Sequence, residues 1–185
     1  MAPTYTYNAF DGADWRDSVS KAAADLGRED QWQEWEEEYQ ARVDEVRARL
    51  DEEGIDPVVA SISFWNDKVN IGCTGVPCLV FADLGLKIAP QANATEDGLQ
   101  DGEAPELSVE ELGTLEGIDV VFDSADEDGV MSLNEEQLTR NPLWQNLPFV
   151  KDDQIYAYNM EMQYGSPSGQ MAFLEVVEKP LLGGN

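Results

Sequence analysis

Short apolar runs alternate with helical patterns from residue 58 to the end of the chain. The runs VVASISF and IDVVF are typical of buried strands, and QIYAY is typical of a strand. Helices are predicted at residues 76–85, 108–115 and 168–182, the second opened by a capping box of Ser108 and Glu111, and a region of helical turns is predicted at 134–147. Strands separated by helices of this length predict a parallel sheet covered on both faces, and therefore a Rossmann-like α/β fold. The polar segment 91–106 is predicted to be a loop.

A long amphipathic helix is predicted ahead of this unit, at residues 29–53. Its apolar residues recur every three or four positions and form one stripe: Trp32, Trp35, Tyr39, Val43, Val46 and Leu50. A coiled coil is the competing interpretation, but the stripe covers fewer than three heptads. A strand at residues 4–10 and a helix at 13–27, ending at Gly27, are predicted before it.

The charge balance excludes several classes of function. The chain has 185 residues, 42% of them hydrophobic, which is enough for one core. It has 38 Asp and Glu against 11 Lys and Arg, a net charge of −27, which repels nucleic acids and anionic lipid surfaces. It has no His, which rules out imidazole-based triads and zinc sites. No apolar stretch is long enough to span a membrane, and the start is unlike a signal peptide.

Two cysteines, Cys73 and Cys78, lie in the turn-like segment GCTGVPC. They are close enough in the chain to form a disulfide in an oxidising compartment. Two free thiols are an equally good interpretation of the same segment.

The expected ligand site lies beyond the carboxyl ends of the parallel strands, where open α/β sheets bind their ligands. The segments that leave those ends are FWNDK, DSADEDG and NMEMQYG. The first and third combine aromatic or thioether side chains with amides, as small-molecule sites do. The candidate contacts are Phe64, Trp65, Asn66, Met162 and Tyr164. The alternative is that Met162 and Tyr164 pack under a neighbouring loop.

The segment SADEDGVMSLNE partly fits a calcium-binding loop, with Asp126, Asp128 and Glu135 at the third, fifth and twelfth positions. However, Ser124 stands where the first ligand should be, and a strand precedes it instead of a helix. Calcium binding is therefore the weaker hypothesis. Paired carboxylates are too common in this sequence to indicate a glycosidase.

Several segments in register resemble a known family. YQARVDEVRARL, VVASISF, VFADLGLKIAPQ, LSVEELGTLEGIDVVF and NPLWQNLPFVKDDQIYAYNMEMQYG together look like the carboxyl-terminal half of a ferric-siderophore substrate-binding protein of an ABC importer. The resemblance runs from about residue 3 to residue 182, and PLWQNLPFVKDDQIY is its most specific part.

The resemblance implies two α/β lobes joined by one long helix, with the ligand held between the lobes. It assigns residues 1–28 to the end of an amino-terminal lobe, 29–54 to the connecting helix and 55–185 to the carboxyl-terminal lobe. Most of the first lobe and its lipid-anchor signal would then be missing, which implies a truncated chain. It also implies an extracytoplasmic protein, a permease as partner, no catalysis and no cofactor besides the ferric siderophore as ligand. Apolar surface left bare on the long helix and the cleft loops predicts self-association.

Residue by residue, Tyr164 falls where hydroxamate-siderophore binders of the family use a ligand-contacting Tyr, and Met162 falls where they use a Trp. Trp65 and Asn66 lie in the loop that lines the cleft. Many relatives have an Arg in that loop, whereas this chain offers only Lys68. An anionic complex needs a compensating cation, so a neutral or cationic ferric hydroxamate is expected.

Two rival functions remain open. One is an acidic calcium-binding adaptor that dimerises through the striped helix. The other is a metal chelatase or a nitrogenase-cofactor-like domain, for which the sequence supplies almost no Cys or His ligands.

Overall fold

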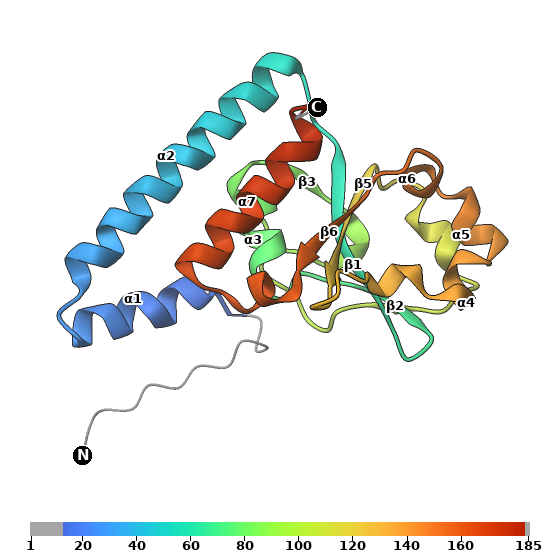
Figure 1. The fold of residues 1–185 in the computed structure, drawn as a ribbon, viewed down its shortest axis with the longest axis horizontal. Coiled ribbons are helices and arrows are strands. Elements are labelled where there is room, and N and C mark those ends of the chain that lie inside the picture. The colour runs from blue at the N-terminus through green and yellow to red at the C-terminus, as the bar shows by residue number, and fades with distance from the viewer. Residues whose placement is uncertain (1–12, 184–185) are drawn as a thin grey trace.

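A mixed β-sheet forms the centre of the computed structural model, which describes residues 13–183 (Figure 1). Among these residues the strands follow the order β4-β2-β1-β5-β6, and β3 pairs with β1 beside β2. The strands are β1 (Val58–Trp65), β2 (Lys68–Ile71), β3 (Lys87–Ile88), β4 (Glu106–Leu107), β5 (Val120–Ala125) and β6 (Ile155–Asn159). The three strands predicted from VVASISF, IDVVF and QIYAY are thus adjacent in the sheet, while the predicted strand at residues 4–10 lies outside the described residues.

The parallel part of the sheet matches the prediction, but one edge does not. β1, β3, β5 and β6 are parallel to one another, whereas β2 pairs antiparallel with both β1 and β4. The segment FWNDK, expected to be an open loop, is a tight hairpin between β1 and β2. Asn66 and Asp67 both have positive φ, which is the backbone of a two-residue hairpin turn. The expectation of a wholly parallel sheet was therefore wrong at this edge.

Helices cover both sides of the sheet, as predicted. In Figure 1, α7 and α3 lie on one side of the strands with α2 outside α7, and the short helices α4 to α6 lie on the other. The helices are α1 (Trp15–Asp25), α2 (Glu29–Glu53), α3 (Val76–Asp83), α4 (Glu136–Thr139), α5 (Pro142–Asn146), α6 (Pro148–Lys151) and α7 (Pro167–Leu181). The buried side chains form one core between and around these layers.

The apolar stripe of α2 is buried within the chain itself. Its members are buried except Trp35, which is half-buried, and they pack against α1 and α7. Arg42 and Arg49 of α2 both form ion pairs with Glu178 of α7. The expectations that the helix leaves a bare apolar surface, or pairs through its stripe with another molecule, were therefore wrong.

Buried and partly buried polar contacts join α1 and α2 to the rest of the molecule. The indole N–H of Trp15 donates to Gln170 at 2.8 Å, and Gln170 is fully buried in α7. The hydroxyl of Tyr39 donates to Asp83 of α3 at 2.7 Å, and Arg16 pairs with the same carboxylate at 3.0 Å. These contacts fix the position of α7 and of the segment that precedes it.

The predicted helix at residues 108–115 is instead a single 3₁₀ turn, η2 (Leu112–Leu115). The capping contact does form, because the backbone N–H and the hydroxyl of Ser108 both donate to Glu111, at 2.9 and 2.7 Å. Gly113 and Gly117 follow it closely, and glycine disfavours a helix interior. Segment 91–106 is mostly loop, as predicted, with its last residue in β4.

Candidate ligand-binding site

A cavity of about 450 Å³ lies at the carboxyl ends of β1, β5 and β6. Its apolar lining consists of Phe64, Trp65, Val130, Met131, Met160 and Tyr164. Its polar lining consists of Ser63, Ser124, Asp126, Ser132, Glu135 and Gln163. The three segments that leave the parallel strands therefore meet at one site, at the position expected for a ligand in this class of fold.

Large apolar side chains are exposed mainly at this cavity. Of the six exposed in the described part of the chain, four line it: Trp65, Val130, Met160 and Tyr164. Trp65 is the most exposed, at 71%. A larger hollow of about 820 Å³ beside the end of α3 is lined by none of these six. A cluster of exposed apolar groups in a concave surface indicates a binding site, so the smaller cavity is the better candidate.

One wall of the cavity is held by a buried carboxylate. Asp123 of β5 is fully buried and accepts hydrogen bonds from the Ser132 hydroxyl and the Leu133 backbone N–H, both at 2.9 Å. The Ser132 oxygen in turn accepts the backbone N–H of Phe64 at 2.8 Å. Burial raises the pKa of Asp123 to about 6, although these hydrogen bonds act in the opposite direction. The chain of contacts joins β1, β5 and the 3₁₀ turn η3 (Ser132–Asn134).

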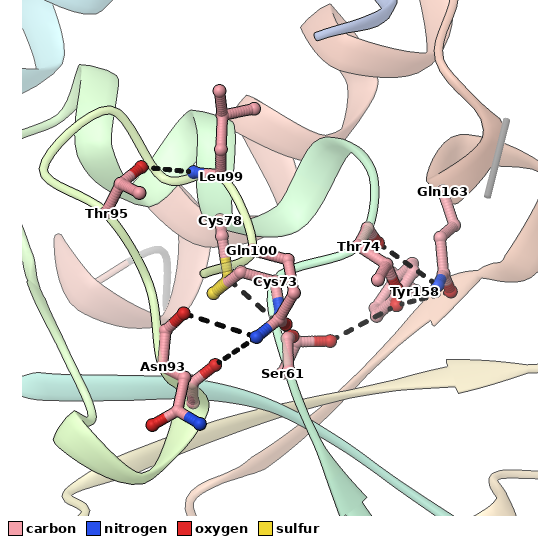
Figure 2. The surroundings of a disulfide bond; sticks show 12 residues. Ser61, Cys73, Thr74, Cys78, Asn93, Thr95, Leu99, Gln100, Tyr158 and Gln163 are labelled. Carbon is pink, nitrogen blue, oxygen red and sulfur yellow. Dashed lines mark hydrogen bonds between the residues drawn. A yellow bond between two sulfur atoms is a disulfide. The ribbon is translucent and has the colours of Figure 1, made fainter. Parts of the chain in front are cut away.

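The opposite wall is the 3₁₀ helix η4 (Met160–Tyr164). Gln163 of η4 accepts a hydrogen bond from the Tyr158 hydroxyl at 3.1 Å and donates one to the Thr74 carbonyl oxygen at 3.4 Å. Figure 2 shows this amide between the two partners. Burial raises the pKa of Tyr158 to about 12, so its hydroxyl keeps its proton at neutral pH. Gly75 packs so closely that a Cβ there would lie 2.3 Å from the Gln163 carbonyl oxygen.

A disulfide closes the loop on which Thr74 and Gly75 lie. Cys73 and Cys78 are bonded and buried, which resolves the two interpretations of the sequence in favour of the bridge. Gln100 accepts the Cys73 backbone N–H at 2.6 Å and donates to the carbonyl oxygens of Ala92 and Asn93 (Figure 2). The covalently closed loop thus connects segment 92–100 to the cavity wall η4.

The structure brings together three of the five residues singled out from the sequence. Phe64, Trp65 and Tyr164 line the cavity. Asn66 lies in the hairpin turn and is not part of the lining. Met162 packs against the core, and Met160 lines the cavity instead.

Several lining residues were not predicted from the sequence, and two of them, Met160 and Gln163, are related by the helical geometry of η4. Side chains three apart share a face of a 3₁₀ helix, so Met160 and Gln163 belong together once η4 is known to be 3₁₀. Val130, Met131 and Ser132 follow Gly129, where the chain turns back to bridge Ala125 with Met131. Nothing in the sequence indicated that turn's direction.

Two carboxylates, Asp126 and Glu135, line the cavity, and no Lys or Arg does so among the described residues. Lys68 lies in β2 and is not a lining residue. One oxygen of Asp126 accepts the backbone N–H groups of Asp128 and Val130, at 3.0 and 2.8 Å, and so shapes the turn. Within residues 13–183, no group of three or more Asp, Glu, Cys or His is arranged to hold a metal ion.

The cavity at the carboxyl ends of the parallel strands is where open α/β sheets of many classes bind their ligands. A sequence model of the periplasmic binding protein family matches residues 1–161. The chain therefore belongs to the periplasmic binding protein family. None of the described helices has the length and apolar character needed to cross a membrane.

Solved structures show the same fold. A periplasmic binding protein component of a Fep/Fec-like ferrichrome ABC transporter from Bacillus subtilis matches with a TM-score of 0.75 and 19% identity, over 94% of this chain and 64% of that one. The siderophore periplasmic binding protein from the fuscachelin gene cluster of Thermobifida fusca matches with a TM-score of 0.74 and 20% identity, over 94% of this chain and 63% of that one. The Fe3+-Desferal-bound siderophore-binding protein FhuD from Vibrio cholerae matches with a TM-score of 0.67 and 20% identity, over 91% of this chain and 60% of that one.

The chain spans less than two thirds of the length of these three proteins. No curated protein matches its sequence significantly. The comparisons thus confirm the predicted family resemblance and the α/β fold.

Proposed function

We propose that the protein is an extracytoplasmic binding protein that captures a ferric siderophore of the hydroxamate type and delivers it to the permease of an ABC importer. The function is binding and not catalysis. The family and the siderophore-binding proteins that share the fold support this proposal. Under this proposal, α2 is the helix that connects two lobes. The cavity at the strand ends is the surface with which this lobe contacts the ligand.

The composition of the cavity lining is the observation that carries the proposal. Trp65, Met160 and Tyr164 offer apolar surface of the kind that covers the organic arms of a chelate. A catecholate or carboxylate siderophore complex is anionic and would need a cation to offset its desolvation. The lining contains carboxylates and no Lys or Arg among the described residues, so a hydroxamate complex fits better.

The disulfide supports an extracytoplasmic location. Such bonds persist in oxidising compartments and are rare in the cytosol. Both sulfur atoms belong to buried residues, and their loop contacts the cavity wall through Gln163.

Tryptophan fluorescence tests the proposal, because Trp65 lies in the cavity. The purified chain is titrated with ferric desferrioxamine, ferrichrome and ferric enterobactin in parallel, with calcium chloride in a separate titration. We expect saturable quenching by the hydroxamates, weakened in Tyr164→Ala. Trp65→Phe keeps an aromatic ring and should bind with a smaller quench.

Leu143→Ala is a matched control, because Leu143 is an exposed apolar residue outside the cavity. It should bind as the unmodified protein does. Absence of a response to every chelate would contradict the proposed function. A response to enterobactin alone would contradict the hydroxamate assignment, and a response to calcium alone would favour the calcium-binding hypothesis.

A further inference from the structure

We propose that the ligand carries a positive charge, a protonated amine, and that Asp126 and Glu135 select for it. This inference rests on the proposed function, since it concerns the same cavity. It goes further by naming the charge of the chelate and the two residues that recognise it.

The two carboxylates reach the cavity from separate segments. Asp126 directly follows β5, and Glu135 follows the turn η3. Both are exposed lining residues, and Ser132 between them is held by Asp123 and Phe64. The contact chain behind the cavity therefore fixes the segment between the two carboxylates.

Aromatic rings complete the recognition chemistry. Trp65 and Tyr164 line the same cavity, and Trp65 is the most exposed large apolar residue in the described chain. The faces of aromatic rings attract organic cations, and carboxylates accept hydrogen bonds from ammonium groups. Two carboxylates and two aromatic residues, with no Lys or Arg lining the described cavity to neutralise them, make a site suited to an alkylammonium group.

The expected selectivity is moderate, because the carboxylates are exposed and salt screens exposed charges. We expect a cationic chelate to bind roughly tenfold more tightly than a neutral chelate of the same shape at low ionic strength. The preference should shrink as salt is added.

Ferric desferrioxamine B and its N-acetyl derivative make the test sharp. They share the iron-chelating hydroxamates and differ at one terminal amine, which is charged in the first and neutral in the second. Dissociation constants for both are measured by fluorescence quenching at low and high salt. The measurement is repeated with Asp126→Asn/Glu135→Gln and with Glu135→Gln alone, which leaves the turn of Asp126 intact.

A charge-matched control removes two carboxylates elsewhere. Glu52 and Glu53 are exposed at the end of α2, beside the amino end of β1, whereas the cavity lies at the carboxyl end of β1. Glu52→Gln/Glu53→Gln changes the net charge by the same amount. It should keep the preference for the amine, and the double variant in the cavity should lose most of it.

The outcomes separate this inference from the proposed function. Equal binding of the two chelates by the unmodified protein would overturn the inference and leave siderophore binding intact. An equal loss of preference in the cavity and control variants would also overturn it, because net charge alone would then explain the effect. Failure to bind either chelate would overturn the proposed function itself.

Discussion

The hydroxyl of Ser132 donates a hydrogen bond of 2.9 Å to the buried carboxylate of Asp123, immediately behind the cavity. The same serine oxygen accepts the backbone N–H of Phe64. The Ser132 side chain thus links β5 to the end of β1, where Trp65 lines the cavity. The buried carboxylate makes this wall sensitive to pH.

The first prediction concerns stability and pH. Burial raises the pKa of Asp123 from 3.8 to about 6, so between these values the folded protein binds more protons here than the unfolded chain does. The contribution of Asp123 to the free energy of unfolding is therefore fully present below pH 4 and is lost as pH rises through 6. The loss amounts to roughly 3 kcal/mol. The asparagine side chain of Asp123→Asn does not titrate, so this variant should lack the pH-dependent loss of stability.

Urea unfolding of both proteins between pH 4 and 7.5 measures the effect. The stability of the unmodified protein relative to Asp123→Asn should fall across this range, while the contributions of the other carboxylates largely cancel. Ser132→Ala removes a hydrogen bond that favours the carboxylate and should move the transition to higher pH. A constant difference between the two proteins would contradict the assignment.

The second prediction concerns the amide of Gln163, which joins Tyr158 to Thr74 behind η4. Gln163→Ala removes both contacts and should allow η4 to move. We expect binding of ferric desferrioxamine to weaken by roughly tenfold, because each of the two lost hydrogen bonds contributes a net free energy of about 0.5 to 1.5 kcal/mol to the position of the wall. Isothermal titration calorimetry measures the affinity directly.

Gln145→Ala provides the comparison. Gln145 lies in α5, and its side chain donates one hydrogen bond to the Thr139 carbonyl oxygen, away from the cavity. Its loss should leave the affinity unchanged. Equal weakening in both variants would indicate a general loss of stability and not a role for Gln163 in positioning the wall.

The fold was more predictable than the cavity lining, and for physical reasons. Buried strands need short continuous apolar runs, and the stripe of α2 needs helical spacing, so both are visible in the sequence. The strand β2 has only Val69 and Ile71 as apolar residues, and its position depends on the Asn66 and Asp67 turn. Four residues with this pattern do not distinguish a strand from a loop.

The cavity's location followed from the topology, whereas its exact residues did not. Parallel strands place their carboxyl ends together, which predicted the site near Trp65 and Tyr164. The choice between Met160 and Met162 depends on the backbone conformation of η4. A 3₁₀ helix, an α-helix and an extended segment each turn a different set of side chains toward the cavity. Apolar composition alone cannot settle that rotation.

The third prediction concerns the disulfide. Cys73 and Cys78 are five residues apart, and closing so short a loop should stabilise the protein by about 2 kcal/mol through the entropy of the unfolded chain. Cys73→Ser/Cys78→Ser should therefore unfold at a lower urea concentration. Dithiothreitol should destabilise the unmodified protein to a similar extent and leave the double variant unaffected. Identical unfolding curves with and without the reductant would contradict this account.

The last prediction concerns self-association. Because the stripe of α2 is covered by α1 and α7, the large apolar side chains that remain exposed in residues 13–183 lie mainly at the cavity, and Trp65 is the most exposed of them. Bare patches of this kind tend to pair, so we expect association that increases with protein concentration in sedimentation velocity experiments. Trp65→Ser should weaken it, whereas Leu26→Ser, which removes an exposed apolar side chain next to α1, should not. Ferric desferrioxamine should also dissociate the complex, because it would occupy the same surface. A single monomeric species at all concentrations would contradict this prediction without affecting the proposed ligand.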